Sequence, residues 1–265
     1  MESFKDLTVI TGSSQGLGKA FANTCAKLGR DLVLVSLPNE GLQETARQLT
    51  DKYGVKVICF ETDLTKTENI SRLVQDLSQY EINMLINNAG TGGTKRFLDA
   101  SMEYIENMIF LNMRCLVILT HQIMPLFKKK EQNYILNIGS LAAFSPMPYK
   151  TIYPASKSFI SSFSRGLYAE LKGTNIHVAV ACPGGLATNL DVATRIGNHK
   201  GLLKKSILTA DEAADWCIKK LLKKKHMIIP GRLNQFSSFL QRTIPVRLQM
   251  KLMAGKLEKE MLSKA

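Results

Sequence analysis

Short, continuous runs of apolar residues alternate along the chain with longer segments of mixed polarity. Six β-branched-rich runs predict buried strands: LTVIT at 7–11, DLVLVS at 31–36, VKVICF at 55–60, INMLINN at 82–88, NYILNIG at 133–139 and NIHVAVAC at 175–182. HMIIP at 226–230 predicts a seventh. Continuous apolar runs, rather than alternating ones, are typical of a parallel sheet that is covered on both faces.

The segments between these runs predict helices at 17–29, 40–53, 67–79, 101–128, 151–173 and 210–225. The order is therefore repeatedly strand then helix, which predicts an α/β fold: a Rossmann-type doubly wound parallel sheet of about seven strands with helices on both faces. We expect a single domain over residues 1–230 and a helical extension of the same domain over 231–265. Ligands of such sheets bind beyond the carboxyl ends of the strands.

Composition narrows the class of protein. The chain has 265 residues, of which 45% are hydrophobic, so it can bury a substantial core. Its five cysteines lie far apart in apolar segments, which predicts buried thiols rather than disulfides or metal ligands. No secretory leader and no membrane-spanning segment are recognised, so we expect a cytoplasmic protein without a bound metal.

The first predicted strand leads into the glycine-rich turn TGSSQGLGKA, and this turn fits two kinds of phosphate loop. A triphosphate-binding loop requires a first glycine where Ser13 stands, and a serine or threonine where Ala20 follows Lys19. A dinucleotide loop requires glycines for a sharp turn and a close approach of the pyrophosphate, and Gly12, Gly16 and Gly18 supply them. The loop alone does not exclude a plain turn without ligand.

A second feature is YPASK, which places Tyr153 and Lys157 four residues apart in a predicted helix and hence on one helix face. An ammonium group near a phenol stabilises the phenolate, so we expect Lys157 to lower the pKa of Tyr153. A tyrosine in this setting can act as a general acid or base. By itself such a pair is also common on protein surfaces.

Three further stretches end at the same edge of the predicted sheet. Ser140 follows the fifth strand, NNAG at 87–90 follows the fourth, and CPGGLAT at 182–188 follows the sixth. We therefore expect these stretches to lie beside the glycine-rich turn.

Together these motifs resemble those of the short-chain dehydrogenase/reductase family. TGSSQGLG resembles its cofactor loop, NNAG its fourth-strand motif and YPASK its active site, while Ser140 and Asn112 stand at its other catalytic positions. The pattern is nearest to hydroxysteroid dehydrogenase-like and 3-oxoacyl reductase-like members. The resemblance covers residues from about Leu7 to Met227.

The resemblance implies an oxidoreductase that interconverts a carbonyl and a secondary alcohol by hydride transfer with NAD(P)(H). It implies that Tyr153 donates or accepts the proton, Ser140 binds the carbonyl oxygen, Lys157 lowers the tyrosine pKa and binds the nicotinamide ribose, and Asn112 holds a proton-relaying water. The implied cofactor contacts are Gly12, Ser14, Gln15, Gly16, Leu17, Gly18, Ser36, Asp63, Leu64, Asn88, Ala89, Gly90, Tyr153, Lys157, Pro183, Gly184 and Thr188.

The end of the second strand governs the choice between NAD(H) and NADP(H). Neither the usual acid nor the usual arginine is present, since Ser36 and Leu37 occupy those positions. The sequence favours NADP(H), because Ser36 and Asn39 are able to bind a phosphate that an aspartate would repel. NAD(H) remains the alternative.

The substrate is expected to be apolar, such as a steroid or a fatty-acyl compound, covered by a lid at about 186–208. Lysines in this lid either meet an acidic group of the substrate or are solvated. The family also implies a homodimer or homotetramer formed through the helices at 101–128 and 151–173. Alternatives are a catalytically silent nucleotide sensor or partner-binding protein, and a lyase or epimerase of the same fold.

The C-terminal region is basic. The chain carries a net charge of +13, and fifteen Lys/Arg against five Asp/Glu from residue 200 onward supply +10 of it. Apolar residues recur at helical spacing in 236–261, which predicts a helix over the substrate mouth or on a subunit partner, or one at a membrane surface. Nucleic acid is not expected as a partner, because basic residues do not alternate with aromatic ones.

Overall fold

The computed structural model describes residues 4–187 and 207–250. Its main sheet has seven parallel strands in the order β3-β2-β1-β4-β5-β6-β9. The strands are β1 (Thr8–Thr11), β2 (Leu32–Ser36), β3 (Val57–Glu61), β4 (Met84–Asn87), β5 (Asn133–Ile138), β6 (Ile176–Ala181) and β9 (Met227–Ile228). The predicted fold class is confirmed, and the winding reverses between β1 and β4.

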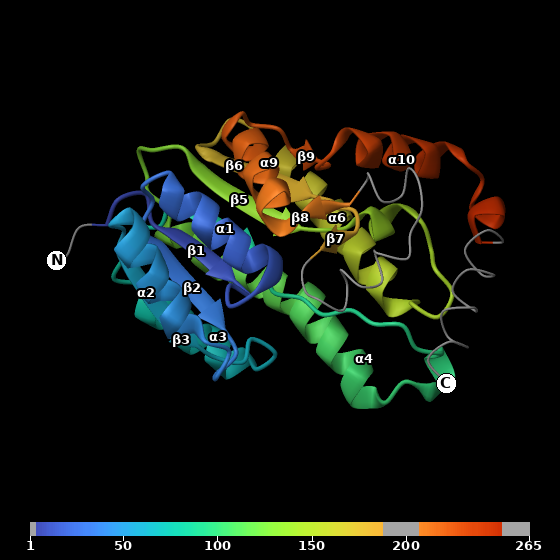
Figure 1. The fold of residues 1–265 in the computed structure, drawn as a ribbon, viewed down its shortest axis with the longest axis horizontal. Coiled ribbons are helices and arrows are strands. Elements are labelled where there is room, and N and C mark those ends of the chain that lie inside the picture. Colours follow the sequence, from blue (N-terminus) through green and yellow to red (C-terminus); the bar gives the residue numbers. More distant parts are fainter. Residues whose placement is uncertain (1–3, 188–206, 251–265) are drawn as a thin grey trace.

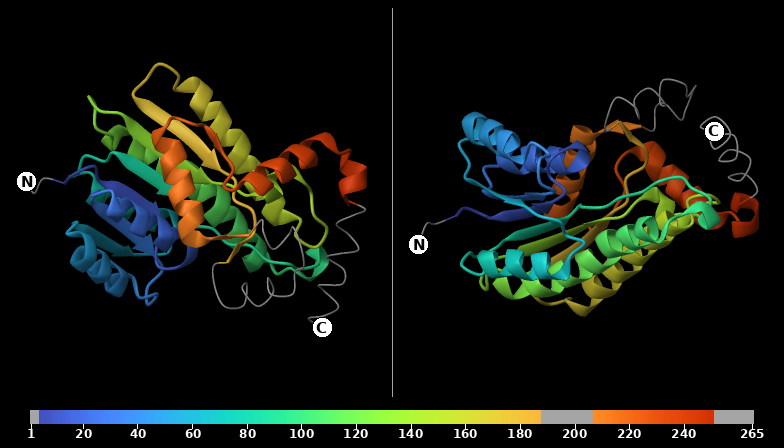
Figure 2. Two further views of the ribbon diagram at one scale, coloured as in Figure 1. Left: turned by 45° about the horizontal axis from the view of Figure 1, so that its top comes forward. Right: turned by 90° about the horizontal axis from the view of Figure 1, so that it is seen from below.

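Helices cover both faces of the sheet, as the right panel of Figure 2 shows. They are α1 (Gly16–Lys27), α2 (Leu42–Tyr53), α3 (Thr67–Leu77), α4 (Met102–Ile109), α5 (Leu116–Ile123), α6 (Ile152–Glu170), α9 (Ala210–Leu222) and α10 (Arg232–Thr243). Short turns of other helix types are η1 (Phe97–Asp99), η2 (Phe110–Cys115), η3 (Met124–Leu126) and η4 (Leu141–Phe144). Figure 1 shows that α10 lies at one end of the molecule and α2 near the other.

Successive residues of the strands point to opposite faces, which explains why the strands read as continuous apolar runs. Ile10 and Leu34 pack in the core under α1, α2 and α9, whereas Val9 and Val35 pack in the core on the other face. All four side chains are fully buried. Burial on both faces is what places β1 and its outgoing loop at the centre of the fold.

The stretch predicted as one helix at 101–128 is divided. It consists of α4, a π-helical turn η2, α5 and the 3-10 turn η3. A π turn holds one residue more than an α turn, and such turns are frequent at functional sites. Asn112 lies in this turn and is buried.

Met102–Leu126 is also the one helical stretch, among the described residues, that is long and apolar enough to cross a membrane by length and composition. The sequence analysis does not expect such a stretch. Leu119 and Ile123 nevertheless pack in the core against the sheet. These contacts fit a central helix of the domain.

Several predicted boundaries differ from the structure. The seventh strand is two residues long instead of five, and Pro230 and Gly231 follow it after Ile229. The ends of the predicted lid at 186–208 form a second small sheet, in which β7 (Leu186–Ala187) pairs in parallel with β8 (Leu208–Thr209). The residues between 187 and 207, with Thr188, lie outside the described part of the chain, as do residues 251–265.

All five cysteines are free thiols. Cys25, Cys115, Cys182 and Cys217 are buried and Cys59 is partly buried. Burial raises the pKa of each of these thiols above its ordinary value. The prediction of buried thiols is confirmed for four of the five cysteines, and Cys59 is partly exposed.

Candidate active site

The glycine-rich turn and the start of α1 form a compact unit at the carboxyl end of β1. Gly12 and Gly16 adopt left-handed backbone angles, with φ of 64° and 53°. A Cβ atom on Gly18 would lie 1.9 Å from the Gly12 oxygen, so the helix and the turn touch directly. No side chain caps α1, which begins after Gln15. The unpaired amides of its first turn are therefore available to an anion.

The loop after β4 is bound to this turn by hydrogen bonds. Asn88 Nδ2 donates to the oxygens of Thr11 and Gly12, both at 3.0 Å. Thr11 Oγ1 accepts from the amides of Asn88 at 3.0 Å and Ala89 at 2.9 Å. The two loops that the sequence analysis expects at one edge thus form a single wall.

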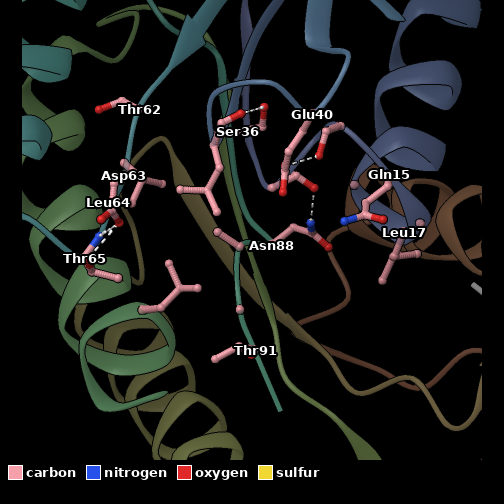
Figure 3. Close-up of a pocket in the computed structure, with 18 of the residues that line it drawn as sticks. Gln15, Leu17, Ser36, Glu40, Thr62, Asp63, Leu64, Thr65, Asn88 and Thr91 are labelled. Carbon is pink, nitrogen blue, oxygen red and sulfur yellow. Dashed lines mark hydrogen bonds between the residues drawn. The ribbon is translucent and has the colours of Figure 1, made fainter. Parts of the chain in front are cut away.

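This wall borders a cavity of about 560 Å³. Figure 3 shows Asp63, Leu64 and Thr65 on one side of it, Gln15, Leu17 and Glu40 on the other, and Asn88 between them. Twelve predicted cofactor residues line the cavity: Gly12, Ser14, Gln15, Gly16, Leu17, Gly18, Ser36, Asp63, Leu64, Asn88, Ala89 and Gly90. Its size, its glycines and its uncapped helix fit a dinucleotide.

The other predicted cofactor residues are not part of this lining. Tyr153, Lys157, Pro183 and Gly184 are absent from it. Gly184 instead faces the side chain of Asn234, since a Cβ there would lie 2.7 Å from Asn234 Oδ1.

Seven lining residues were missed by the sequence analysis: Leu37, Glu40, Thr62, Thr65, Thr91, Asn107 and Leu111. Of these, Glu40 carries charge. Ser14 Oγ donates a hydrogen bond to Glu40 Oε2 at 2.6 Å, across the mouth of the cavity. The sequence does show a glutamate four residues after the second strand. It does not show where this side chain points, because the course of the loop between Ser36 and α2 is not predictable from the sequence.

Of the two residues on which the NADP(H) preference rests, Ser36 lines the cavity and Asn39 does not. Ser36 is buried and its hydroxyl donates to the oxygen of Leu37 at 3.0 Å. Asn39 is exposed and does not line the cavity. Asp63 Oδ1 accepts from the amide and the hydroxyl of Thr65, at 2.9 and 2.7 Å.

The four predicted catalytic residues lie next to this wall. Tyr153 and Lys157 come from the first turns of α6, Ser140 directly precedes η4, and Asn112 comes from η2. A Cβ on Gly90 would lie 3.0 Å from Asn112 Oδ1 and 3.5 Å from Lys157 Nζ. Gly90 in the loop after β4 therefore lies close to both side chains.

Tyr153 is partly buried and lies beside the side chain of Ser140. Burial raises the pKa of Tyr153 above its ordinary value, against the opposing effect of the neighbouring Ser140 side chain. This net direction is opposite to the one expected from Lys157, and the lowering of the tyrosine pKa by Lys157 stays a prediction. Lys157 Nζ lies over the tyrosine ring, 5.7 Å from its centre, and donates to the Ile138 oxygen at 2.9 Å. Burial also lowers the pKa of Lys157 to about 8.

Asn112 makes hydrogen bonds to protein atoms on both sides. Its Oδ1 accepts from the amide of Thr91 at 2.8 Å, and its Nδ2 donates to the Thr91 oxygen at 2.9 Å and to Ser156 Oγ at 3.0 Å. Ser156 Oγ in turn donates to the oxygen of Tyr153 at 2.8 Å. Asn112 therefore joins the loop after β4 to the helix that carries Tyr153.

Residues 6–198 match the family model for short chain dehydrogenase. The chain is 35% identical over 187 residues to a very-long-chain 3-oxoacyl-CoA reductase of Anas platyrhynchos, covering 69% of this chain and 60% of that protein. It is 32% identical over 215 residues to human (Homo sapiens) 17-beta-hydroxysteroid dehydrogenase type 3, covering 80% of this chain and 67% of that protein. The chain thus spans well under the full length of the reductase.

Among solved structures, a short-chain dehydrogenase from Sphingobium yanoikuyae in complex with NADPH is similar. It has 30% sequence identity and a TM-score of 0.76, over 91% of this chain and 97% of that one. Sequence motifs, sheet order and site geometry all agree with these matches. The chain belongs to the short-chain dehydrogenase family.

Proposed function

We propose that this protein is a NAD(P)(H)-dependent reductase that interconverts an apolar carbonyl compound and its secondary alcohol. The observation that carries the proposal is that Tyr153 lies beside both Ser140 and Lys157, next to the dinucleotide-sized cavity. The pair of Ser140 and Tyr153 suits a carbonyl oxygen, because two hydroxyl groups can bind the same oxygen atom.

The cofactor, when bound, supplies hydride to the carbonyl carbon or takes it from the alcohol. Gly12, Gly16, Gly18 and Asn88 would hold its pyrophosphate end. In reduction, Tyr153 donates its phenolic proton to the carbonyl oxygen while Ser140 keeps that oxygen in place. Lys157, next to the tyrosine ring, then favours the phenolate that is left.

The raised pKa of Tyr153 supports reduction as the favoured direction at neutral pH. The phenol is then protonated and ready to donate its proton. Alcohol oxidation requires the phenolate, which burial disfavours.

Asn112 is proposed as a positioning residue. Its hydrogen bonds to Thr91 and Ser156 hold the start of α6 against the loop after β4. The water-relay role that the resemblance implies for Asn112 stays a prediction.

For the preferred cofactor we propose NAD(H), in place of the NADP(H) that the sequence favours. Glu40 and Asp63 line the cavity, and no Lys or Arg does so among the described residues. A 2′-phosphate would face the Glu40 carboxylate, whereas a ribose hydroxyl is able to donate to it. The Sphingobium relative, whose fold is similar, was solved with NADPH.

An apolar substrate is supported by the surroundings of Tyr153. A small cleft beside it is lined by Phe97, Tyr104 and Tyr149, together with Lys95 and Lys150. The names of the two relatives, an acyl-CoA reductase and a hydroxysteroid dehydrogenase, point to the same substrate classes. We further propose a cytoplasmic homodimer or homotetramer formed through α4, α5 and α6.

The testing experiment follows NADH and NADPH consumption with a panel of steroid, aliphatic and 3-oxoacyl ketones. Turnover with release of oxidised cofactor supports the proposal. Cofactor binding without turnover of any ketone would favour a nucleotide sensor, and turnover without net change in free cofactor would favour a lyase or epimerase.

A further inference from the structure

Helix α10 has an inverted distribution of polar and apolar side chains. Asn234 and Ser238 face the protein and are 3% and 2% exposed. Phe236, Phe239 and Leu240 face outward and are 66%, 64% and 44% exposed. A helix on the surface of a protein in water normally buries its apolar side. The exposed apolar side of α10 is therefore suited to contact with an apolar environment other than the protein's own core.

The apolar surface continues past Pro245 in the helical turn at 246–250. Val246, Leu248 and Met250 are exposed there, at 53%, 49% and 43%. We define the docking surface as the exposed side chains Phe236, Phe239, Leu240, Val246, Leu248 and Met250.

The two parts of the docking surface are held together by Gln249. Its Nε2 atom donates to the oxygens of Gln241 at 2.6 Å and Ile244 at 2.7 Å, and its side chain is buried. These hydrogen bonds therefore fix residues 246–250 relative to α10.

The charged residues around the docking surface are all basic. Between Arg232 and Leu257 the sequence holds five basic residues and no acidic one. Arg242 is stacked on Phe144, 4.2 Å from the ring centre, and Arg232 and Arg247 are exposed. A symmetric pairing of two copies through this surface would oppose like charges. An anionic lipid surface satisfies both the charge and the apolar side chains.

We propose that α10 and residues 246–250 dock this protein on an anionic lipid bilayer, with the exposed aromatic side chains at the level of the head groups. Figures 1 and 2 show α10 at one end of the molecule, where its outward side is free of other described elements. Helix α10 adjoins the candidate active site, because it packs against η4, which begins directly after Ser140. This proposal does not depend on the proposed reaction.

The test is co-sedimentation of the full chain with vesicles of phosphatidylcholine alone and of phosphatidylcholine mixed with phosphatidylglycerol. Binding is expected to the mixed vesicles only and to weaken as salt rises. The double variant Phe236→Ser/Phe239→Ser is expected to lose roughly tenfold or more in binding. Leu222→Ser, an exposed apolar position at the end of α9, is the matched control and is expected to bind as the parent does.

Arg247→Gln tests the charge, with Arg72→Gln on α3 as its control. The first is expected to weaken binding to the mixed vesicles and the second to leave it unchanged. Circular dichroism checks that each variant is folded. Absence of vesicle binding in the parent protein, or equal binding by the double variant, would overturn the proposal. Dimerisation that the double variant abolishes, without vesicle binding, would overturn it in favour of a second copy.

Discussion

Lys157 Nζ donates a hydrogen bond to the main-chain oxygen of Ile138 at 2.9 Å, in surroundings that bury the amine fully. The Lys157 amine, which the sequence predicts to act on Tyr153, is thus hydrogen-bonded to the last residue of β5. One consequence concerns stability, and others concern the reaction.

The pKa of Lys157 is lowered from 10.5 to about 8 by burial. Between about pH 8 and pH 10.5 the Lys157 amine is protonated in the unfolded chain and unprotonated in the folded chain. The contribution of Lys157 to the free energy of unfolding therefore rises with pH in this range. The free energy of unfolding of the parent, minus that of Lys157→Met, should be flat below about pH 8. It should then rise by at most about 3 kcal/mol towards pH 10.5. Urea unfolding without cofactor at several pH values measures this, and a difference that does not change with pH contradicts it.

Replacing Tyr153 with Phe removes the proton donor but keeps the ring. We expect kcat/KM for ketone reduction to fall by roughly 10²- to 10⁴-fold, with cofactor affinity little changed. In the parent protein, reduction should persist at neutral pH, whereas alcohol oxidation should rise with pH, since the pKa of Tyr153 is raised. Steady-state kinetics in both directions check this, and Tyr168→Phe, near the other end of α6, serves as the control. Unchanged turnover in Tyr153→Phe would refute the assigned role.

Glu40 offers a test of cofactor choice. Glu40→Gln removes the carboxylate that faces the cavity, so the ratio of kcat/KM for NADPH to that for NADH should rise roughly tenfold or more. Glu44→Gln, on the exposed side of α2, should leave the ratio unchanged. If Glu40→Gln leaves it unchanged as well, the carboxylate does not meet the ribose.

Gly18 tests the contact between the glycine-rich turn and α1. A Cβ at Gly18 would clash with the Gly12 backbone, so Gly18→Ala should weaken cofactor binding strongly and lower stability. Gly166→Ala in α6, where a Cβ meets no atom within 4 Å, should bind cofactor normally and be more stable by about 0.5 to 1 kcal/mol. Thermal shift with and without NADH measures both effects. Normal cofactor binding by Gly18→Ala would contradict the proposed cradle.

The sheet was predictable because its strands are buried on both faces and therefore have an unbroken apolar pattern. The glycine spacing and the motifs after β4 and β5 indicated which loops meet at the cavity. Glu40 was not predictable in the same way, because no periodic pattern governs a loop. The lowered pKa of Lys157 was also out of reach, since it depends on burial and on the Ile138 oxygen.

The division of the helix at 101–128 was missed for a related reason. Apolar residues on both sides of Asn112 repeat at nearly the same spacing, and one additional residue in a turn changes that pattern little. Helix α10 was predicted as amphipathic, but the sequence does not say which of its sides meets the protein.

The π turn at Phe110–Cys115 also limits how this part of the chain can change in length. Deleting one residue within it would close the turn into a regular α-helix, because a π turn fits one extra residue into about the rotation of an α turn. The flanking helices α4 and α5 would keep their relative rotation, but the residues of the turn would shift and Asn112 would lose its contact to Thr91. This stretch therefore tolerates exchanges of side chains more readily than the loss of a single residue, whereas loops elsewhere accept changes in length.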